Sequence, residues 1–441
     1  MQHQNSLKNR IFAVAGKPII HSNSSKIFKK FIAQNKLDAK YIKACGNDAK
    51  ILLNELIYND IEGINITAPF KEDFFNLADN YSKEAKFLRA TNTMLLNNGG
   101  LYAYNSDVFG VYQSLKKNLG KIENQKILVI GAGGAAKAVV YALKKHKCHV
   151  YIVNRSAEKA KKLSQQFECN HIDIEDIRKN KIDFHGVVNT LEYPYSLFET
   201  ESLKNISWLL DANYKNSLYK AFCIENNIKF IDGMGWLTGH ALKVFEIFFD
   251  IKSSMDFSKI NKENEANRKI ISLIGMPGSG KTSLGKLLAE QISYKFIDAD
   301  LLIEKKTNKN ISEIFAQDGE EKFREIESEI PHWIAEEFGD KKIILATGGG
   351  FPLSAENREW LQNHTFCIYL SAQTPTLAKR LNQNQRPLLQ KGSLTENLNN
   401  LFQIRRLFYL NSCHLLIENN TNKLNETVSL LVEDFRKSGI L

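Results

Sequence analysis

The segment 275–282, with the sequence GMPGSGKT, constrains this chain more than any other stretch, because it matches the pattern G-x-x-x-x-G-K-[ST] at every fixed position. The apolar run 270–274 precedes it, and apolar residues recur at helical spacing after it, from Leu284 to Ile292. A strand, a glycine-rich loop and a helix in this order present backbone N–H groups to phosphate oxygens. We therefore expect a nucleotide-binding phosphate loop here. Its binding residues would be Gly278, Ser279, Gly280, Lys281, Thr282 and Ser283.

A second glycine-rich turn follows the strand pattern of 126–130 and precedes a helical pattern. Such a turn alone is weak evidence, because many turns of this kind only pack a helix closely on a strand. A further predicted strand, 150–153, ends at Asn154, Arg155 and Ser156, where the residue that reads a ribose should fall. Arginine there suits a 2′-phosphate, which favours NADP over NAD. The expected cofactor-binding residues of the turn are Gly131, Ala132, Gly133, Gly134 and Ala135.

The length of 441 residues predicts about three domains, since one hydrophobic core serves roughly 150 residues. The polar stretch 250–269 has no sustained periodicity and predicts a linker. No apolar run is long enough to cross a membrane, and the polar start carries no export signal. The six cysteines form no C-x-x-C pair, which argues against zinc sites and a disulfide framework. We expect an α/β protein of the cytoplasm.

The net charge of +10 has two explanations. Nucleic-acid binding is one, but the lysines are dispersed and no basic stretch is interleaved with stacking aromatic residues. Attraction of small anionic substrates is the other, and we favour it. We expect small-molecule substrates and no nucleic-acid partner, and the sequence leaves the oligomeric state open.

Polar residues follow several predicted strands in the N-terminal part of the chain. They comprise Ser22, Ser24, Asn65, Thr67, Lys71, Asn92 and Asp107. Serines before a helix are more often caps than ligands, so Ser22 and Ser24 alone decide nothing. Together, however, the set supplies donors and acceptors for hydroxyl groups and a cation that can exchange a proton. This is what a hydroxylated carboxylic acid requires of a binding site.

The N-terminal half resembles the shikimate dehydrogenase family over about residues 10–255. The resemblance is carried by the glycine turn and by the segments 20–24 (IHSNS), 65–71 (NITAPFK), 91–93 (TNT), 105–107 (NSD) and 232–235 (DGMG). It implies an α/β substrate domain of residues 1–104 and 237–255, and a Rossmann NADP-binding domain of residues 105–236. The residues that it implies for the substrate are Ser22, Ser24, Asn65, Thr67, Lys71, Asn92, Asp107, Tyr214 and His240.

The same resemblance makes Lys71 and Asp107 the catalytic pair. Hydride that reaches a ketone carbon leaves an alkoxide, which a lysine ammonium can stabilise and protonate. The cofactor would contact Asn154, Arg155, Ser156 and Gly235. His240 stands where the family has a glutamine, which leaves two alternatives open. In one the dehydrogenase half has become a degenerate binding module, and in the other it prefers quinate.

Further motifs follow the phosphate loop. Alternation along a predicted strand, 296–300, points Asp298 and Asp300 to one side, where carboxylates suit Mg²⁺ and a hydroxyl group. The other motifs are 319–324 (GEEKFR), 343–350 (IILATGGG) and 380–389 (RLNQNQRPLL). They predict an arginine at a helix start, bare backbone amides after a strand, and a mobile lid with an arginine. Any one of these arginines alone is more often a solvated surface residue.

Taken together, residues 268–441 resemble shikimate kinase, which implies a P-loop α/β domain with a parallel sheet. The implied roles are Lys281 and Arg386 for the transferring phosphoryl group, Thr282 and Asp298 for Mg²⁺, Asp300 for the attacking hydroxyl, Arg324 and Arg405 for the carboxylate, Gly349 and Gly350 for the pocket wall, and Arg380 for adenine. Arg405 is preferred over Arg406 because the family arginine lies four residues before a tyrosine, here Tyr409.

The two resemblances imply consecutive reactions on one polypeptide. Residues 1–255 would reduce 3-dehydroshikimate to shikimate with NADPH, and residues 268–441 would phosphorylate shikimate with Mg²⁺ and ATP. Residues 256–267 would be the linker between them.

Overall fold

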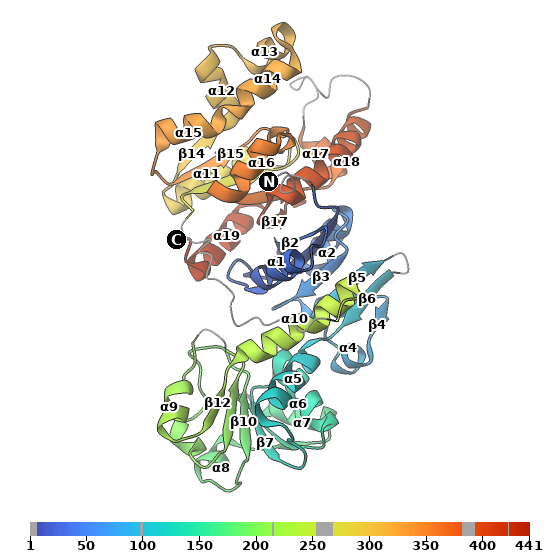
Figure 1. The fold of residues 1–441 in the computed structure, drawn as a ribbon, viewed down its shortest axis with the longest axis vertical. Helices are drawn as coiled ribbons and strands as arrows, with labels where there is room; N and C mark the ends of the chain where they lie inside the picture. The colour runs from blue at the N-terminus through green and yellow to red at the C-terminus, as the bar shows by residue number, and fades with distance from the viewer. Residues whose placement is uncertain (1–6, 98–99, 214–215, 253–267, 382–392, 422) are drawn as a thin grey trace. The chain divides into compact units, whose positions relative to one another are not determined.

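The computed structural model describes residues 7–97, 100–213, 216–252, 268–381, 393–421 and 423–441 of the chain (Figure 1). The chain forms two compact units, one of residues 1–74 and 259–441 and the other of residues 75–258. Most of the predicted linker lies outside the described residues. The domain limits expected from the sequence stay predictions.

One run of parallel strands organises the first unit, in the order β14-β15-β13-β16-β17-β2-β1-β3. The strands are β1 (Arg10–Ala15), β2 (Ala39–Cys45), β3 (Gly63–Ile66), β13 (Ile270–Ile274), β14 (Lys295–Asp298), β15 (Ile343–Ala346), β16 (Thr365–Ser371) and β17 (Leu415–Glu418). Figure 1 shows β2 beside β17, so the blue N-terminal strands continue the sheet of the yellow to red strands.

Helices follow these parallel strands along the chain. They are α1 (Ser24–Gln34), α2 (Ala49–Tyr58), α3 (Lys71–Asn76), α11 (Lys281–Ile292), α12 (Ala299–Thr307), α13 (Ile311–Gln317), α14 (Gly319–Ser328), α15 (Ile330–Phe338), α16 (Ala355–His364), α17 (Thr374–Arg380), α18 (Leu394–Ser412), α19 (Leu424–Ser438) and the short 3₁₀ helix η3 (Phe351–Leu353). The strands β15 and β16 are buried along their whole length, as strands covered on both faces require. Apolar residues of α1, from Ile27 to Ile32, are buried where their helical spacing predicts.

The strand predicted for residues 296–300 is shorter than expected. It ends at Asp298, whose side chain accepts a hydrogen bond from the N–H of Asp300 at 3.1 Å and caps α12. An aspartate that satisfies a free N–H group in this way favours the start of a helix over continuation of a strand. Asp300 therefore lies in the first turn of α12. The prediction that Asp300 belongs to the strand, and faces the same side as Asp298 by strand alternation, is wrong.

The second unit contains a six-stranded parallel sheet, in the order β12-β11-β10-β7-β8-β9. Its strands are β7 (Lys126–Ile130), β8 (His149–Val153), β9 (Asn170–His171), β10 (Gly186–Asn189), β11 (Trp208–Asp211) and β12 (Lys229–Ile231). In a smaller group, β6 (Gly100–Tyr104) pairs with β5 (Thr93–Asn97) antiparallel and with β4 (Asn80–Tyr81) parallel. The helices are α4 (Lys83–Leu88), α5 (Asp107–Leu119), α6 (Gly134–Lys145), α7 (Ala157–Gln166), α8 (Ile174–Arg178), α9 (Lys220–Glu225), α10 (Gly233–Phe249) and the 3₁₀ helix η1 (Thr200–Leu203).

The central strand β7 separates two hydrophobic cores. Ile127 and Val129 belong to one core, and Leu128 and Ile130 to the other, because side chains alternate along a strand. The sheet is doubly wound, and such sheets bind ligands where the strand order reverses, here between β7 and β10. The α/β class with a Rossmann-type sheet and a P-loop domain, expected from the sequence, is confirmed.

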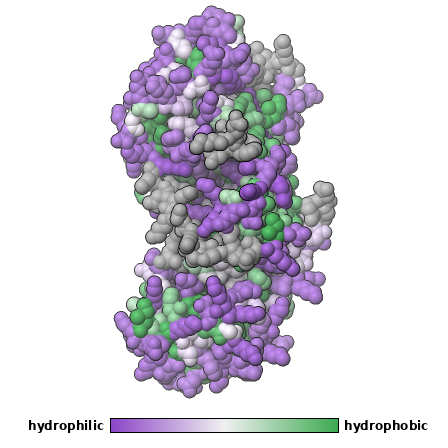
Figure 2. Space-filling model, in the orientation of Figure 1, coloured by the Kyte–Doolittle hydropathy of each residue, from purple (hydrophilic) through white to green (hydrophobic). Residues whose placement is uncertain are grey.

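The surface and the cysteines agree with the composition. Among the described residues, no helix is both long and apolar enough to cross a bilayer. All six cysteines are free thiols. On the face shown in Figure 2, hydrophilic residues cover most of the visible surface.

Candidate functional site

The phosphate loop joins β13 to α11. Gly275, Gly278 and Gly280 have φ of +145°, +79° and +94°, which L side chains rarely adopt. A Cβ at Gly275 would also lie 2.5 Å from the carbonyl oxygen of Leu370 on β16. The Lys281 ammonium donates to the carbonyl oxygens of Gly275 and Met276, both at 3.0 Å, and so bridges the loop. This local geometry is that of an anion cradle at a helix N-terminus.

A cavity of about 580 Å³ opens beside this loop. Its lining includes the predicted residues Gly278, Gly280, Lys281, Thr282, Ser283, Asp298, Asp300, Gly349 and Arg380. Within it, the Thr282 hydroxyl donates to Asp298 Oδ2 at 2.9 Å. A hydroxyl and a carboxylate in contact beside a phosphate cradle are oxygen ligands of the kind that Mg²⁺ takes. The residues present therefore fit a magnesium-bound nucleotide.

A second positively charged side chain, that of Arg324, lies on α14. Arg324 donates from Nη1 to Glu327 at 2.7 Å and from Nη2 to Glu320 at 2.9 Å. Its guanidinium lies so close to Gly350 that a Cβ at that position would be 2.3 Å from Nη1. Burial raises the pKa of Glu327, and the Arg324 charge opposes that rise. Arg324 is thus held in a fixed orientation against bare backbone.

Arg405 of α18 lies close to Gly349, the residue before Gly350. It is only 4% exposed, and a Cβ at Gly349 would be 3.2 Å from its Nη1. Its Nε is buried and has no hydrogen-bond partner in the described part of the chain. Tyr409 donates from its hydroxyl to the carbonyl oxygen of Gly349 at 2.6 Å. An unsatisfied guanidinium donor at this place suits a ligand carboxylate.

In the second unit, the glycine turn after β7 has the open backbone that a dinucleotide needs. Gly131 has φ of +114°, and a Cβ there would lie 2.3 Å from Thr190 Oγ1. Among the described residues, apart from its two chain neighbours, none has an atom within 4 Å of a Cβ placed on Gly133, so a ligand has room to approach. The exposed side chain of Arg155 follows β8, and Ser156 caps α7. The predicted Gly235 is packed against Ser114 of α5.

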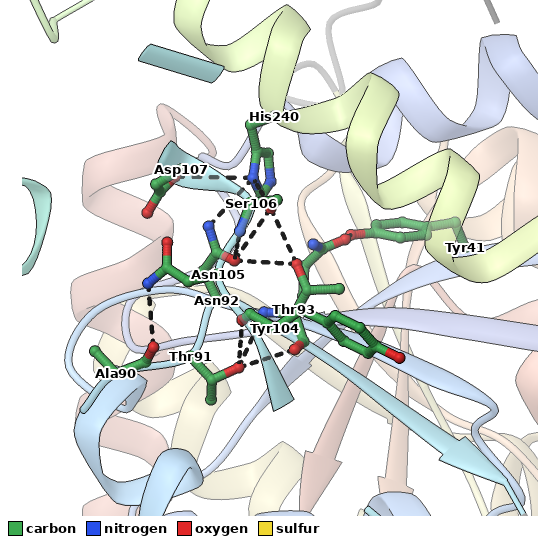
Figure 3. Close-up of polar contacts among 11 residues, drawn as sticks. Tyr41, Ala90, Thr91, Asn92, Thr93, Tyr104, Asn105, Ser106, Asp107 and His240 are labelled. Atoms are coloured by element: carbon green, nitrogen blue, oxygen red, sulfur yellow. Dashed lines mark hydrogen bonds and ion pairs between the residues drawn. The ribbon is translucent and has the colours of Figure 1, made fainter. Parts of the chain in front are cut away.

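The polar residues of the second unit converge on one histidine. Figure 3 shows Asn92, Ser106 and Asp107 grouped around His240 of α10. The distances to His240 Nδ1 are 2.6 Å from Ser106 Oγ, 3.3 Å from Asn92 Nδ2 and 3.7 Å from Asp107 Oδ1. The Ser106 N–H donates to Asn92 Oδ1 at 2.8 Å, which fixes the amide. His240 therefore belongs to the same polar cluster as two predicted substrate residues.

The other predicted substrate residues lie in the first unit. Asn65 on β3 is buried and accepts a hydrogen bond from the Tyr41 hydroxyl at 2.6 Å. Ser22 Oγ accepts from the N–H of Ser24 at 3.3 Å, and the Asn23 side chain makes no cap. Lys71 begins α3. How these residues meet Asn92 and Asp107 stays a prediction, because they belong to the other unit.

Comparison with known proteins identifies both halves. Family models match residues 14–94 (shikimate dehydrogenase substrate binding domain), 113–207 (shikimate / quinate 5-dehydrogenase) and 277–436 (shikimate kinase). A shikimate dehydrogenase (NADP(+)) of Aquifex aeolicus is 31% identical over 55% of this chain and 91% of its own. A shikimate kinase of Symbiobacterium thermophilum is 38% identical over 38% of this chain and 97% of its own. The chain belongs to the shikimate dehydrogenase and shikimate kinase families.

A solved structure supports the dehydrogenase assignment. The crystal structure of shikimate dehydrogenase from Aquifex aeolicus matches 55% of this chain and 94% of its own, with a TM-score of 0.52 and 31% identity. The chain therefore combines a shikimate dehydrogenase with a shikimate kinase domain, and both are enzymes.

The kinase pocket also contains residues that the sequence did not single out. Asn419 lines the cavity and donates from Nδ2 to the carbonyl oxygen of Ser279 at 2.8 Å. Glu327 holds Arg324, and its helical spacing of three residues was a signal that could have found it. No such signal exists for Asn419, which is 140 residues from Ser279.

The two neighbouring arginines of α18 have different surroundings. Arg405 faces Gly349, whereas Arg406 contacts the carboxylate of Asp60 near the surface. The role of Arg405 in the pocket stays a prediction. Two other predicted residues, Tyr214 and Arg386, lie outside the described residues.

Proposed function

We propose that this chain reduces 3-dehydroshikimate to shikimate with NADPH and then phosphorylates shikimate with ATP and Mg²⁺. The observation that carries the proposal is the arrangement around the phosphate loop. The Thr282–Asp298 pair borders the phosphate cradle, and Arg324 and Arg405 flank the backbone of Gly349 and Gly350. A phosphate donor and a carboxylate-bearing acceptor are thereby accommodated in one site.

In the kinase domain, Lys281 and the loop amides hold the phosphates while Arg324 and Arg405 grip the acceptor's carboxylate. Asp300, in the first turn of α12, accepts the proton of the attacking hydroxyl group. Thr282 and Asp298, which are in contact at 2.9 Å, would hold Mg²⁺, and the ion would supply positive charge to the phosphate oxygens when bound. The phosphate donor and the acceptor are thus aligned by residues of five elements, α11, β14, α12, α14 and α18.

In the dehydrogenase, Lys71 protonates the oxygen of the reduced carbonyl, and Asp107 orients the Lys71 ammonium. Ser22, Ser24, Asn65, Thr67 and Asn92 bind the carboxylate and hydroxyl groups of the substrate, with His240 beside Asn92 and Asp107. The relative of Aquifex aeolicus is named as an NADP(+) enzyme, and Arg155 suits the 2′-phosphate of that cofactor. NADPH supplies the hydride when bound.

One coupled assay tests the proposal. The full-length chain is supplied with 3-dehydroshikimate, NADPH, MgCl₂ and ATP, and the products are identified by mass spectrometry. We expect NADPH oxidation, ADP release and shikimate 3-phosphate. Omission of NADPH should stop both reactions from 3-dehydroshikimate, whereas added shikimate should restore ADP release. Turnover of quinate at a higher kcat/KM than shikimate in the oxidative direction would contradict the assigned dehydrogenase substrate.

A further inference from the structure

The kinase and the dehydrogenase substrate domain share one sheet within the first unit. Strand β2, inside the match to the dehydrogenase substrate binding domain, pairs in parallel with β17 of the kinase. The paired residues are Lys43 with Leu415, Ala44 with Leu416, and Cys45 with Ile417, and all of them are at most 1% exposed. Each strand would otherwise be the unpaired edge of its own sheet. The two domains are therefore joined by buried backbone pairing in addition to the linker.

The side chain of one dehydrogenase residue, Glu55, accepts hydrogen bonds from the kinase. Glu55 of α2 is fully buried and accepts hydrogen bonds from Ser371 Oγ and Asn420 Nδ2, both at 2.5 Å. Ser371 is the last residue of the kinase strand β16, and Asn420 lies two residues after the kinase strand β17 ends. Asn420 in turn accepts from the N–H of Gln373 at 2.8 Å. Glu55 thus ties together the loops that follow both strands.

Those loops touch the nucleotide site. Asn419, next to Asn420, lines the cavity and bonds the carbonyl oxygen of Ser279 in the phosphate loop. The Asn419 N–H donates to the carbonyl oxygen of Ser371 at 2.8 Å. One residue beyond Asn420, Thr421 accepts from Nη2 of Arg380, the residue predicted to flank adenine. Glu55 therefore bonds Asn420, and the residue before Asn420, Asn419, lines the predicted nucleotide cavity.

Conversely, the side chain of one kinase residue, Asp434, accepts hydrogen bonds from the dehydrogenase backbone. Asp434 of α19 is fully buried and accepts from the N–H groups of Ile19 at 2.7 Å and Ile20 at 2.9 Å. The carbonyl oxygen of Ile19 accepts from the N–H of Ser22 at 3.0 Å. Asp434 therefore fixes the backbone that leads directly into the predicted substrate residues Ser22 and Ser24. Buried backbone N–H groups need such an acceptor, because leaving them unpaired is costly.

We propose that the two enzymes position each other's binding loops: Glu55 of the dehydrogenase orders the kinase nucleotide loop, and Asp434 of the kinase orders the dehydrogenase loop that carries Ser22 and Ser24. Both are positioning residues, because neither borders a reacting group. Burial raises the pKa of both carboxyl groups, and their hydrogen bonds oppose that rise. The inference rests on the proposed pair of activities and adds a dependence of each activity on the other domain.

The test uses full-length variants and measures both activities in each. Glu55→Gln keeps the shape of the side chain but turns an amide N–H₂ group toward one of its donors. We expect it to raise the KM for ATP and the Kd for a fluorescent ADP analogue by about 5- to 50-fold, the range of one or two charge-assisted hydrogen bonds. The kcat of the kinase and the KM for 3-dehydroshikimate should stay within about twofold, a split that general loosening of the fold would not produce.

Asp434→Asn should have the mirror-image effect. The KM for 3-dehydroshikimate should rise by about 5- to 50-fold, while the KM values for NADPH and ATP stay within about twofold. Asp60→Asn and Glu433→Gln are matched controls. Asp60 also reaches the kinase, through Arg406, but its side chain is 68% exposed, and Glu433 adjoins Asp434 but pairs with Lys437 at the surface. Both controls should behave as the wild type.

Amide hydrogen exchange gives a reading that does not need turnover. Glu55→Gln should speed exchange in residues 275–283 and 419–421, and Asp434→Asn in residues 19–24, with little change elsewhere. Nucleotide affinity and exchange rates that stay at wild-type values would overturn the proposal, as would equal loss of both activities together with a lower melting temperature. If the wild-type chain lacked one reaction, the proposed function would fail, but nucleotide binding and exchange would still decide this inference.

Discussion

Gly350→Ala tests whether bare backbone in the kinase pocket is what allows Arg324 to reach the substrate. A Cβ at position 350 would lie 2.3 Å from Arg324 Nη1 and 2.5 Å from both Cζ and Nη2. Ordinary contacts begin at about 3.4 Å, so the guanidinium must retreat by about 1 Å from its present place. It cannot do so freely, because Glu327 and Glu320 hold both of its terminal nitrogens.

A displacement of this size is expected to be costly for substrate binding. Misplacing a binding group by about 1 Å can lower the rate by about 10²-fold, and a charge-assisted hydrogen bond contributes about 1.5 to 3 kcal/mol. We therefore expect the kinase kcat/KM for shikimate to fall by about 10- to 100-fold. The KM for ATP should change by less than about threefold, because Arg324 is not among the residues that line the nucleotide cavity.

The assay follows ADP release at saturating ATP over a range of shikimate concentrations. A double-mutant cycle with Arg324→Ala supplies the control, because coupled residues give non-additive effects. If Gly350→Ala acts through Arg324, it should cause little further loss in the Arg324→Ala background. A loss of the same size in both backgrounds, or no loss in the wild-type background, would refute the steric explanation.

Three further predictions concern other parts of the chain. Lys71→Ala should lower the dehydrogenase kcat by about 10²- to 10⁴-fold, the usual contribution of a general acid, without changing ADP release from shikimate; near-normal reduction would remove Lys71 from the mechanism. Thr282→Ala should raise the Mg²⁺ concentration for half-maximal kinase activity by about tenfold, since it loses one oxygen ligand, while an unchanged requirement would argue against this metal site. Desolvation and nearby cations hold the pKa of His414 in the folded chain well below 6.5. As the pH falls below 6.5, His414 therefore becomes protonated in the unfolded chain but not in the folded chain. This group should then lower the free energy of unfolding by at most about 1.4 kcal/mol for each unit by which the pH falls. Urea unfolding of the wild type and of His414→Gln between pH 7.5 and 5.5 measures this effect, and the same pH dependence of the free energy of unfolding in both would contradict the prediction.

Motifs that depend on neighbouring residues were predictable without a structure. The phosphate loop and the glycine turn at Gly131 each occupy one strand-loop-helix segment, so their pattern and their conformation are both local. The periodicity of apolar residues indicated the strands and helices on either side for the same reason. Even there, the strand expected as far as Asp300 ends at Asp298, whose side chain caps the helix that begins at Ala299.

Contacts between distant segments could not be predicted in the same way. Glu55 bonds a residue 316 positions away, Asp434 bonds one 415 positions away, and no periodicity in either segment indicates the other. The sequence by itself determined which chemical groups the chain carries and which local turns bind phosphate. Only the tertiary structure decided that β2 and β17 form one sheet, because strand edges offer the same backbone donors and acceptors to any partner and the choice between partners depends on the burial of the whole interface.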